Sequence, residues 1–254
     1  MYIEQLSCTL QGDLNVPAFE RAWQRVVDRH PVLRTAFIGE GLKEPVQVVH
    51  RRVKLPLDKQ DWRGLSKDEQ ETRLEAFLRA ERHNGFKLSE PPLMRLALIR
   101  IDEDAYKFVW THHHLLMDGW SLPILLQEVF AFYEAFRRGQ DLHLEPPRPY
   151  RDYIVWLKRQ DMSQAEAFWR RTLKGFTAPT PLVVDRPPSD KAAVAGDAGY
   201  GKQEILLSVE TTAALQSLAR QHELTLNTLV QGAWALLLNR YSGCLLYTSP
   251  SPRD

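Results

Sequence analysis

Two consecutive runs of β-forming residues constrain the fold of this chain more than any other feature. The runs cover residues 93–101 and 105–114, and a short acidic connection separates them. In the second run Tyr106, Phe108 and Trp110 alternate with other residues, which is the period of a strand. Two such runs joined by a short polar turn are typical of a hairpin. The sequence therefore predicts an antiparallel strand pair.

The second run leads into the sequence HHHLLMDGWS at residues 112–121. Strand periodicity places His112 and His114 on the face of the alternating aromatic residues and His113 on the opposite face. Beyond this motif, the apolar residues adopt helical spacing over residues 122–136. The motif is therefore expected where a strand ends and a helix begins.

His114 and Asp118 make this junction a candidate for chemistry. A rigid strand fixes a side chain while the following turn opens space in front of it. An imidazole that titrates near neutral pH can accept a proton from an amine or an alcohol, and Gly119 permits a backbone conformation or close approach that a larger residue resists. Buried structural histidines are more common than catalytic ones, so the interpretation depends on the spacing of His114 and Asp118, four positions apart.

Metal binding is the alternative use of these histidines. His112 and His114 on one strand face resemble a two-histidine zinc half-site. Asp118 is the one nearby residue that offers a third ligand. We treat this as the minor hypothesis and expect no metal, and a metal assay of the purified protein decides between the two.

Further elements follow from periodicity and from helix start signals. Asn15 is a plausible N-cap, with Pro17 tolerated in the first turn, and Ser66 and Glu69 form a capping-box pattern. The helix predicted from Thr225 is apolar on most faces, so we expect it to be buried in a second core. The predicted elements are strands at residues 3–10, 33–38, 45–49 and 203–207, helices after Asn15 and Ser66, and helices at 150–160, 163–174, after Ser208 and from Thr225.

Changes in composition divide the chain. Residues 177–201 contain several prolines followed by small residues, which is typical of a linker. Residues 1–176 then form a first lobe, and residues 202–243 are the truncated start of a second. Residues 244–254 match a translation of transposase-adapter DNA from sequencing libraries, so we exclude them from the fold as an artefact.

The charge balance argues against nucleic-acid binding. The chain has 33 lysines and arginines and 32 acidic residues, and no basic block is interleaved with aromatic residues. No apolar stretch is long enough to cross a bilayer, and the first residues lack a signal-peptide pattern, so we expect a cytoplasmic protein without a membrane partner. With Cys244 excluded, Cys8 has no partner for an internal disulfide.

Three motifs together resemble one protein family. Residues 113–121 are similar to the HHxxxDG signature of the condensation domains of nonribosomal peptide synthetases, in the chloramphenicol-acetyltransferase-like superfamily. Residues 29–37, RHPVLRTAF, are similar to the family's RHxxLRTxF, and residues 150–156, YRDYIVW, to its YxDYxxW. The resemblance runs from about residue 2 to residue 243. The family's first motif and most of its second lobe are missing, so the domain is expected to be incomplete at both ends.

The resemblance implies an α/β (α+β) fold with a mixed sheet flanked by helices. It also implies amide-bond formation, in which the amine of one carrier-bound residue attacks the thioester of another. The substrates would be held on the 4′-phosphopantetheine arms of an upstream donor and a downstream acceptor carrier protein, beside an adenylation domain, and no cofactor would be bound directly. Because one wall of the channel is missing, this chain is expected to be inactive alone.

Within the site, the resemblance implies three catalytic roles. His114 lies beside the attacking amine as a general base or a positioning group. His113 supports the geometry of the motif, and the backbone amide of Gly119 faces the developing oxyanion.

Structural roles are implied for the remaining motif residues. Asp118 is expected to brace the turn through an ion pair with Arg34, because a buried carboxylate needs a partner. Channel or support roles fall to Trp120, Ser121 and Tyr153. For Trp120 the structural alternative is core packing, and for Ser121 it is the N-cap of the next helix. The other histidines, such as His30, lack supporting neighbours in the sequence and are assigned to ordinary structure.

Two other functions stay open. An acyltransferase that uses acyl-CoA or an alcohol acceptor shares the HHxxxDG motif, and the matches around Arg34 and Tyr153 argue against it. A non-catalytic domain that only docks carrier proteins is the second alternative, and an intact His114 argues against that.

Overall fold

The structure is a computed structural model that describes residues 2–176 and 204–242. The predicted linker and the excluded segment at residues 244–254 lie outside the described residues. The chain divides into two compact units, Met1–Val155 and Trp156–Asp254. Among the described residues, no helix combines the length and apolar character needed to cross a membrane.

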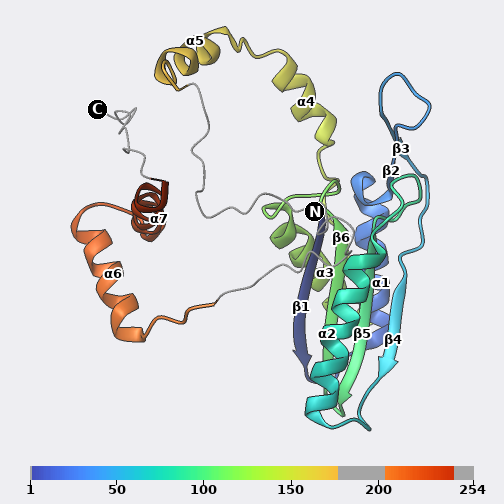
Figure 1. The fold of residues 1–254 in the computed structure, drawn as a ribbon. Coiled ribbons are helices and arrows are strands. Elements are labelled where there is room, and N and C mark those ends of the chain that lie inside the picture. The colour runs from blue at the N-terminus through green and yellow to red at the C-terminus, as the bar shows by residue number, and fades with distance from the viewer. Residues whose placement is uncertain (1, 177–203, 243–254) are drawn as a thin grey trace, which may run out of the picture. The chain divides into compact units, whose positions relative to one another are not determined.

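A four-stranded sheet forms the centre of the first unit (Figure 1). Its strands stand in the order β1-β6-β5-β4, with β1 and β5 antiparallel to β6 and with β4 parallel to β5. The strands are β1 (Ile3–Gln11), β4 (Leu57–Asp61), β5 (Met94–Asp102) and β6 (Ala105–His113). The predicted hairpin is thus the middle of the sheet. The expectation of a mixed sheet flanked by helices is confirmed.

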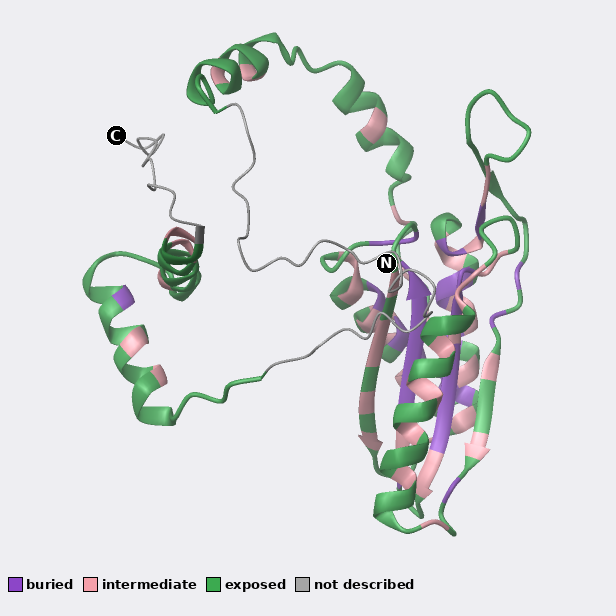
Figure 2. Cartoon of the chain, in the orientation of Figure 1, coloured by how far each residue is buried: buried purple, intermediate pink, exposed green. Residues whose placement is uncertain are grey.

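One face of the sheet packs on α1 (Val16–Arg29) and α3 (Ser121–Arg137). The ring of Trp23 on α1 lies 4.8 Å from that of Trp110 and 5.6 Å from that of Phe108 on β6, between ring centroids. Figure 2 shows that the buried residues concentrate along β5 and β6. The alternation read from the sequence therefore identifies the strand face that faces the core.

The opposite face of the sheet packs on α2 (Lys67–Asn84). Arg95 on β5 donates a hydrogen bond to Glu81 of α2 at 2.8 Å, and no residue of α2 is fully buried. The helix begins with the predicted capping box between Ser66 and Glu69, and both of its reciprocal bonds are present. Local start signals thus position a helix that contributes little to the core.

The predicted N-cap of α1 is also confirmed, since Asn15 accepts a hydrogen bond from the amide of Ala18 at 3.0 Å. The strand expected from residue 33 begins later than predicted. A short 3-10 helix at Pro31–Arg34 precedes β2 (Thr35–Ile38), because Pro31 at its start has the φ of a helical turn. β2 pairs with β3 (Val46–Val49) in a separate two-stranded sheet.

The described C-terminal part consists of helices. These are α4 (Tyr150–Lys158), which spans the boundary between the units, and α5 (Ser163–Thr172), α6 (Val209–Gln221) and α7 (Leu226–Ser242). Ser208 caps α6 as predicted, through a bond from the amide of Thr211 at 3.1 Å.

Two expectations for this part are wrong within the described residues. Residues 204–207 form no strand, and Ile205 and Leu206 are almost fully exposed. A strand needs a neighbouring strand for its backbone bonds, and composition alone does not supply one. The apolar side chains of α7, such as Val230 and Trp234, are exposed rather than buried. A two-helix hairpin has too little surface to enclose a helix that is apolar on most faces.

Candidate active site at the end of strand β6

The turn after β6 is held by its own backbone and by the core. The amide of Leu116 donates to the carbonyl of His113 at 3.0 Å. Leu116 and Met117 are buried in the main apolar cluster of the first unit. The turn is therefore anchored at its second half, while His114 and Leu115 at its tip are exposed.

The three consecutive histidines have three different environments. His112 is 3% exposed, and its ring lies 4.9 Å from that of Trp110. His113 is also buried and stacks on the ring of Tyr2 at 5.9 Å between centroids. His114 is exposed, and its backbone amide donates to the carbonyl of Tyr2 at 2.7 Å. His114 is thus the member of the run that is open to a substrate.

Burial keeps the first two imidazoles neutral. Desolvation, followed by the neighbouring His114 and His113, lowers the pKa of His112 to about 4. Desolvation and then His114 also lower the pKa of His113. A buried charge without a partner is costly, so neither ring gains a proton at neutral pH. This separates two structural histidines from the exposed one.

Asp118 caps the helix that follows the turn. The amide and the hydroxyl of Ser121 both donate to Asp118 Oδ1, at 3.0 and 2.8 Å. The hydroxyl bond is the main cause that lowers the pKa of the Asp118 carboxyl. The Ser121 amide also donates to the backbone carbonyl of Asp118 at 3.1 Å, so the carboxylate is a second acceptor for this amide. It lies near the positive end of the helix dipole, where a negative charge is favourable.

The predicted ion pair between Asp118 and Arg34 is absent from the structure. Asp118 is exposed, so the premise of a buried carboxylate is wrong. The guanidinium of Arg34 instead donates to backbone carbonyls, to Val27 at 3.1 Å and to His50 and Arg51. The guanidinium and the carboxylate thus each have their own hydrogen-bond partners, so neither needs the other. Asp118 still braces the turn, but its partner is Ser121.

The alternative expectations for Ser121 and Trp120 are also corrected. Ser121 is the first residue of α3 and makes no cap bond of its own, because it donates to Asp118 instead. Trp120 is 87% exposed, so it is not a core residue. Its assignment to a channel wall stays a prediction.

Gly119 does not need the conformational freedom of glycine in this structure. Its φ lies outside the left-handed region, and a Cβ at this position would meet no atom within 4 Å. The open space beside Gly119 thus leaves room for another molecule. Tyr153 lies on α4, half exposed, with its ring 5.5 Å from that of Tyr150 between centroids.

The zinc hypothesis finds no support in the geometry. Within residues 2–176 and 204–242, no group of three histidine, cysteine, aspartate or glutamate residues is placed to hold a metal ion. The ring of His112 packs against Trp110 on the core side, whereas His114 is exposed.

Two partners of motif residues cannot be predicted from the sequence. Tyr2 contacts both His113 and His114 although more than 110 positions separate them, because β1 pairs with the end of β6. His30 Nε2 lies 2.6 Å from Glu128 Oε2 on α3, so this histidine does have a partner. No local sequence pattern predicts either contact, because both arise from tertiary packing.

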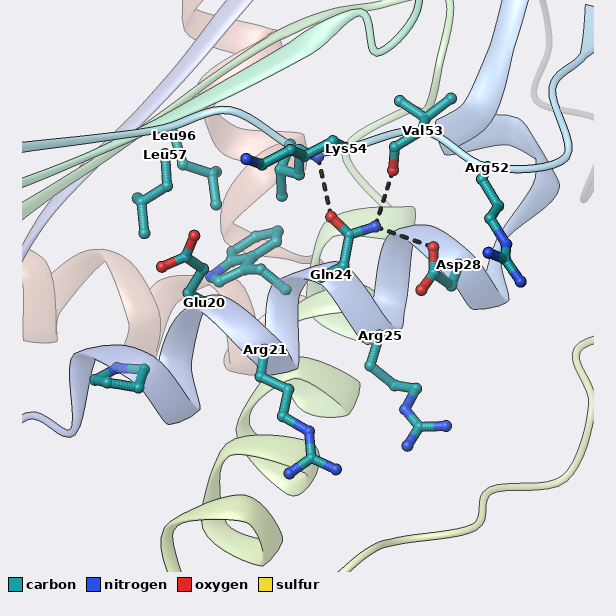
Figure 3. Close-up of a pocket in the computed structure, with 13 residues that line it drawn as sticks. Glu20, Arg21, Gln24, Arg25, Asp28, Arg52, Val53, Lys54, Leu57 and Leu96 are labelled. Carbon is teal, nitrogen blue, oxygen red and sulfur yellow. Dashed lines mark hydrogen bonds between the residues drawn. The ribbon is translucent and has the colours of Figure 1, made fainter.

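A groove lies away from the motif residues (Figure 3). It has a volume of about 910 Å³ between α1 and residues 52–57. Gln24 crosses it with hydrogen bonds to the carbonyl of Val53 at 2.9 Å and to the amide of Leu55 at 3.0 Å. Arg21 and Arg25 point away from this segment in Figure 3. None of the motif residues lines this groove, so we treat it as the junction of helix and strand layers.

Comparisons with known proteins address the family directly. The condensation-domain family model matches residues 1–244. A linear gramicidin synthase of Brevibacillus parabrevis is 51% identical over 242 residues, which are 95% of this chain and 5% of that protein. Chondramide synthase cmdD of Chondromyces crocatus is 43% identical over 248 residues, 96% of this chain and 6% of that protein. The chain thus spans about a twentieth of the length of these relatives.

Solved structures show the same fold. SgcC5 of Streptomyces globisporus, crystallised with a naphthyl ethanediol and sucrose, matches with a TM-score of 0.77 and 24% identity, over 96% of this chain and 55% of that one. The cyclization-docking bidomain of EpoB from Sorangium cellulosum matches with a TM-score of 0.68 and 24% identity, over 95% and 47%. The expected chloramphenicol-acetyltransferase-like fold class is confirmed. With the motif, the family match and the fold in agreement, the chain belongs to the condensation-domain family of nonribosomal peptide synthetases.

Proposed function

We propose that this chain contributes the HHxxxDG half of a site that forms amide bonds between two carrier-bound substrates. The observation that carries this proposal is the environment of the histidine run, in which His114 is exposed at the end of a rigid strand while His112 and His113 are buried and neutral. A substrate that approaches the turn meets one imidazole, that of His114, whose backbone amide is bonded to the carbonyl of Tyr2 next to the β1–β6 pairing.

The reaction needs one nitrogen–carbon bond to form and one carbon–sulfur bond to break. The α-amine of the acceptor attacks the thioester carbonyl of the donor, and the donor's thiolate leaves. His114 contacts the amine and either accepts its proton or orients it, and the proton ends on the leaving thiol. Both roles require an imidazole that is open to the substrate, as His114 is.

The rest of the motif supports that step. The amide of Gly119 is the proposed oxyanion donor, since the space beside it is open and a backbone amide stabilises developing negative charge. Asp118 fixes the path of the turn through Ser121. Trp120, Ser121 and Tyr153 are the proposed wall of the substrate channel, and the exposure of Trp120 is consistent with that role.

The proposed partners follow from the family. Donor and acceptor carrier proteins present the substrates on phosphopantetheine arms, next to an adenylation domain and in the cytoplasm, and no further cofactor takes part. The relatives are synthetases much longer than this chain, which supports a setting with several domains. Residues 1–176 and 202–243 are the proposed contributions to the two lobes, joined by residues 177–201.

An exchange experiment tests the function. Residues 1–243 replace the matching segment of the linear gramicidin synthase to which the chain is 51% identical. The donor and acceptor carrier proteins are loaded chemically, and the mass of the acceptor-bound product is measured. The proposal expects an amide-linked product. A correctly folded chimera that binds both carriers without forming product would support the docking alternative.

An alcohol acceptor is the second candidate, and one observation favours it. SgcC5, which shares the fold, was crystallised with a diol. The same assay separates the two functions when the acceptor arm carries either an aminoacyl group or its hydroxyacyl analogue. Faster ester than amide formation would support the acyltransferase alternative.

A further inference from the structure

Tyr2 lies outside the motif and contacts two of its histidines. Its ring is stacked on His113 with an interplanar angle of 21°, and its carbonyl accepts the hydrogen bond from the amide of His114. The first contact is made by the side chain and the second by the backbone. A substitution at this position therefore removes the first and keeps the second.

The ring of His113 has a defined tautomer in this arrangement. The amide of Leu115 donates to His113 Nδ1 at 3.1 Å, so Nδ1 must present its lone pair. A neutral imidazole with an acceptor at Nδ1 carries its proton on Nε2. Protonation of Nδ1 would break this bond and place two N–H groups against each other at the start of the turn.

Burial keeps the His113 ring neutral. Burial is the first cause that lowers the pKa of His113, and His114 is the second. The Tyr2 ring packs near the imidazole in a stacked geometry, with 5.9 Å between ring centroids, although Tyr2 itself is 68% exposed. Its hydroxyl makes no hydrogen bond to any residue that the structure describes. The aromatic ring, rather than the hydroxyl, is thus the part of Tyr2 that acts.

We propose that Tyr2 is a positioning residue, whose ring keeps the His113 imidazole in the orientation in which Nδ1 accepts the Leu115 amide, and thereby maintains the Nε2–H tautomer and the start of the turn that carries His114. The chain of contacts is short. Tyr2 stacks on His113, His113 accepts the amide of Leu115, and His114 lies between these two residues in the sequence. The catalytic consequence of this inference rests on the function proposed above, whereas the tautomer does not.

Nuclear magnetic resonance of the full 254-residue chain tests the structural part. The imidazole nitrogens are labelled with ¹⁵N, and the His113 signals are identified by their loss in His113→Gln. Wild type and Tyr2→Phe are expected to show the Nε2–H tautomer, and Tyr2→Leu a mixture of tautomers with a His113 titration shifted to higher pH. Tyr241→Leu, at another exposed tyrosine, is the matched control and is expected to match wild type. An unchanged tautomer and titration in Tyr2→Leu would overturn the inference.

Activity in the exchanged synthetase tests the consequence. An aromatic pair contributes about 0.5–1.5 kcal/mol, which corresponds to a decrease in kcat of about twofold to tenfold for Tyr2→Leu. The KM for the acceptor carrier is expected to be unchanged, and Tyr2→Phe to restore kcat. If the wild-type chimera forms amide and Tyr2→Leu retains full kcat, the inference fails and the proposed function stands. If the chimera forms no amide while the tautomer responds to Tyr2→Leu, the proposed function fails and the positioning of His113 stands.

Discussion

At the scale of single residues, burial decides what each histidine of the run can do. Three imidazoles follow one another in the sequence, and a two-residue period alone cannot tell which of them is exposed. His112 lies beside Trp110 in the core, and its Nδ1 has no hydrogen-bond partner among residues 2–176 and 204–242. His114 escapes the core because the strand ends one residue before it. The end of β6 therefore separates structural from chemical roles.

His112 is expected to make the protein less stable at acidic pH. The unfolded residue takes up a proton near pH 6.5, whereas the buried ring resists protonation until about pH 4. The unfolded state therefore binds more protons in this window, and stability falls as the pH is lowered from 6.5 to 4. One pKa unit corresponds to about 1.4 kcal/mol, so the loss is about 3 kcal/mol. Urea unfolding at a series of pH values measures it.

Two variants separate the contribution of His112 to the pH dependence of stability from that of other groups. His112→Phe keeps an aromatic ring beside Trp110 and removes the titrating group, so its stability is expected to change less across the same window. His222→Gln removes an exposed histidine and is expected to keep the wild-type pH dependence. Equal pH dependence in wild type and His112→Phe would contradict the burial argument.

Asp118 is expected to stabilise the start of α3 as an acceptor of hydrogen bonds. Asp118→Ala removes the side-chain acceptor of the Ser121 amide and hydroxyl, while the backbone carbonyl at position 118 still accepts the amide, and lowers the melting temperature by a few degrees. Asp118→Asn keeps an oxygen acceptor and is expected to lie between wild type and alanine. Because the pKa of Asp118 is lowered, its contribution is present above the ordinary aspartate pKa of 3.8 and is lost as the pH falls further. Calorimetry that shows Asp118→Ala as stable as wild type would exclude the cap.

At the scale of secondary-structure elements, hydrogen bonds from side chains to the backbone stabilise the ends of helices. α2 has no fully buried residue, so its start depends on the Ser66–Glu69 capping box. Arg34 connects the end of α1 to residues 50–51 through three carbonyl groups. The capping box and the Arg34 hydrogen bonds both lie within a few positions of the end of a helix. Neither of them contacts the candidate site.

The capping box gives a prediction for α2. Ser66→Ala removes the side-chain bond to the N3 amide and is expected to destabilise the protein by about 1 kcal/mol. Ser7→Ala, on the partly exposed strand β1, is the control and is expected to cost less than Ser66→Ala. Denaturant unfolding compares the two variants. Equal stability of Ser66→Ala and wild type would show that the helix start is held by other contacts.

A double-mutant cycle tests the absence of the Arg34–Asp118 pair. Because the two side chains have separate partners, the effects of Arg34→Ala and Asp118→Ala on the unfolding free energy are expected to add. A Ser121→Ala and Asp118→Ala cycle is the positive control and is expected to show coupling. Coupling between Arg34 and Asp118 of the same size as in this control would restore the brace that the sequence suggested.

At the scale of the whole molecule, local signals predict most elements and the β5–β6 pairing, but no contact between elements that are distant in the sequence. The β5–β6 hairpin, the Asn15 cap and the Ser66 capping box follow from patterns within a few residues. β4 was not predicted, because LDKQD carries little apolar periodicity and the strand depends on its parallel pairing with β5.

In the candidate site, too, the local elements could be predicted from the sequence and the contacts with distant residues could not. His114 and the helix after the turn could be placed from the sequence, since strand period and helical spacing meet at the motif. The stacking of Tyr2 on His113 and the true partner of Asp118 could not, because they depend on the register of β1 and on the geometry of the turn. The family resemblance implies an ion pair between Asp118 and Arg34, whereas in the structure Asp118 accepts hydrogen bonds from Ser121, three residues further along the chain.

The exposure of one imidazole at the end of a buried strand is the central claim, and His114→Ala in the exchanged synthetase tests it most directly. The rate of amide formation is measured from the acceptor-bound product in single turnover, with folding checked by the melting temperature. We expect the rate to fall by about 10²-fold to 10⁴-fold, while the melting temperature is unchanged because the side chain is exposed. A His114→Ala chimera that forms the amide at the wild-type rate would contradict this account.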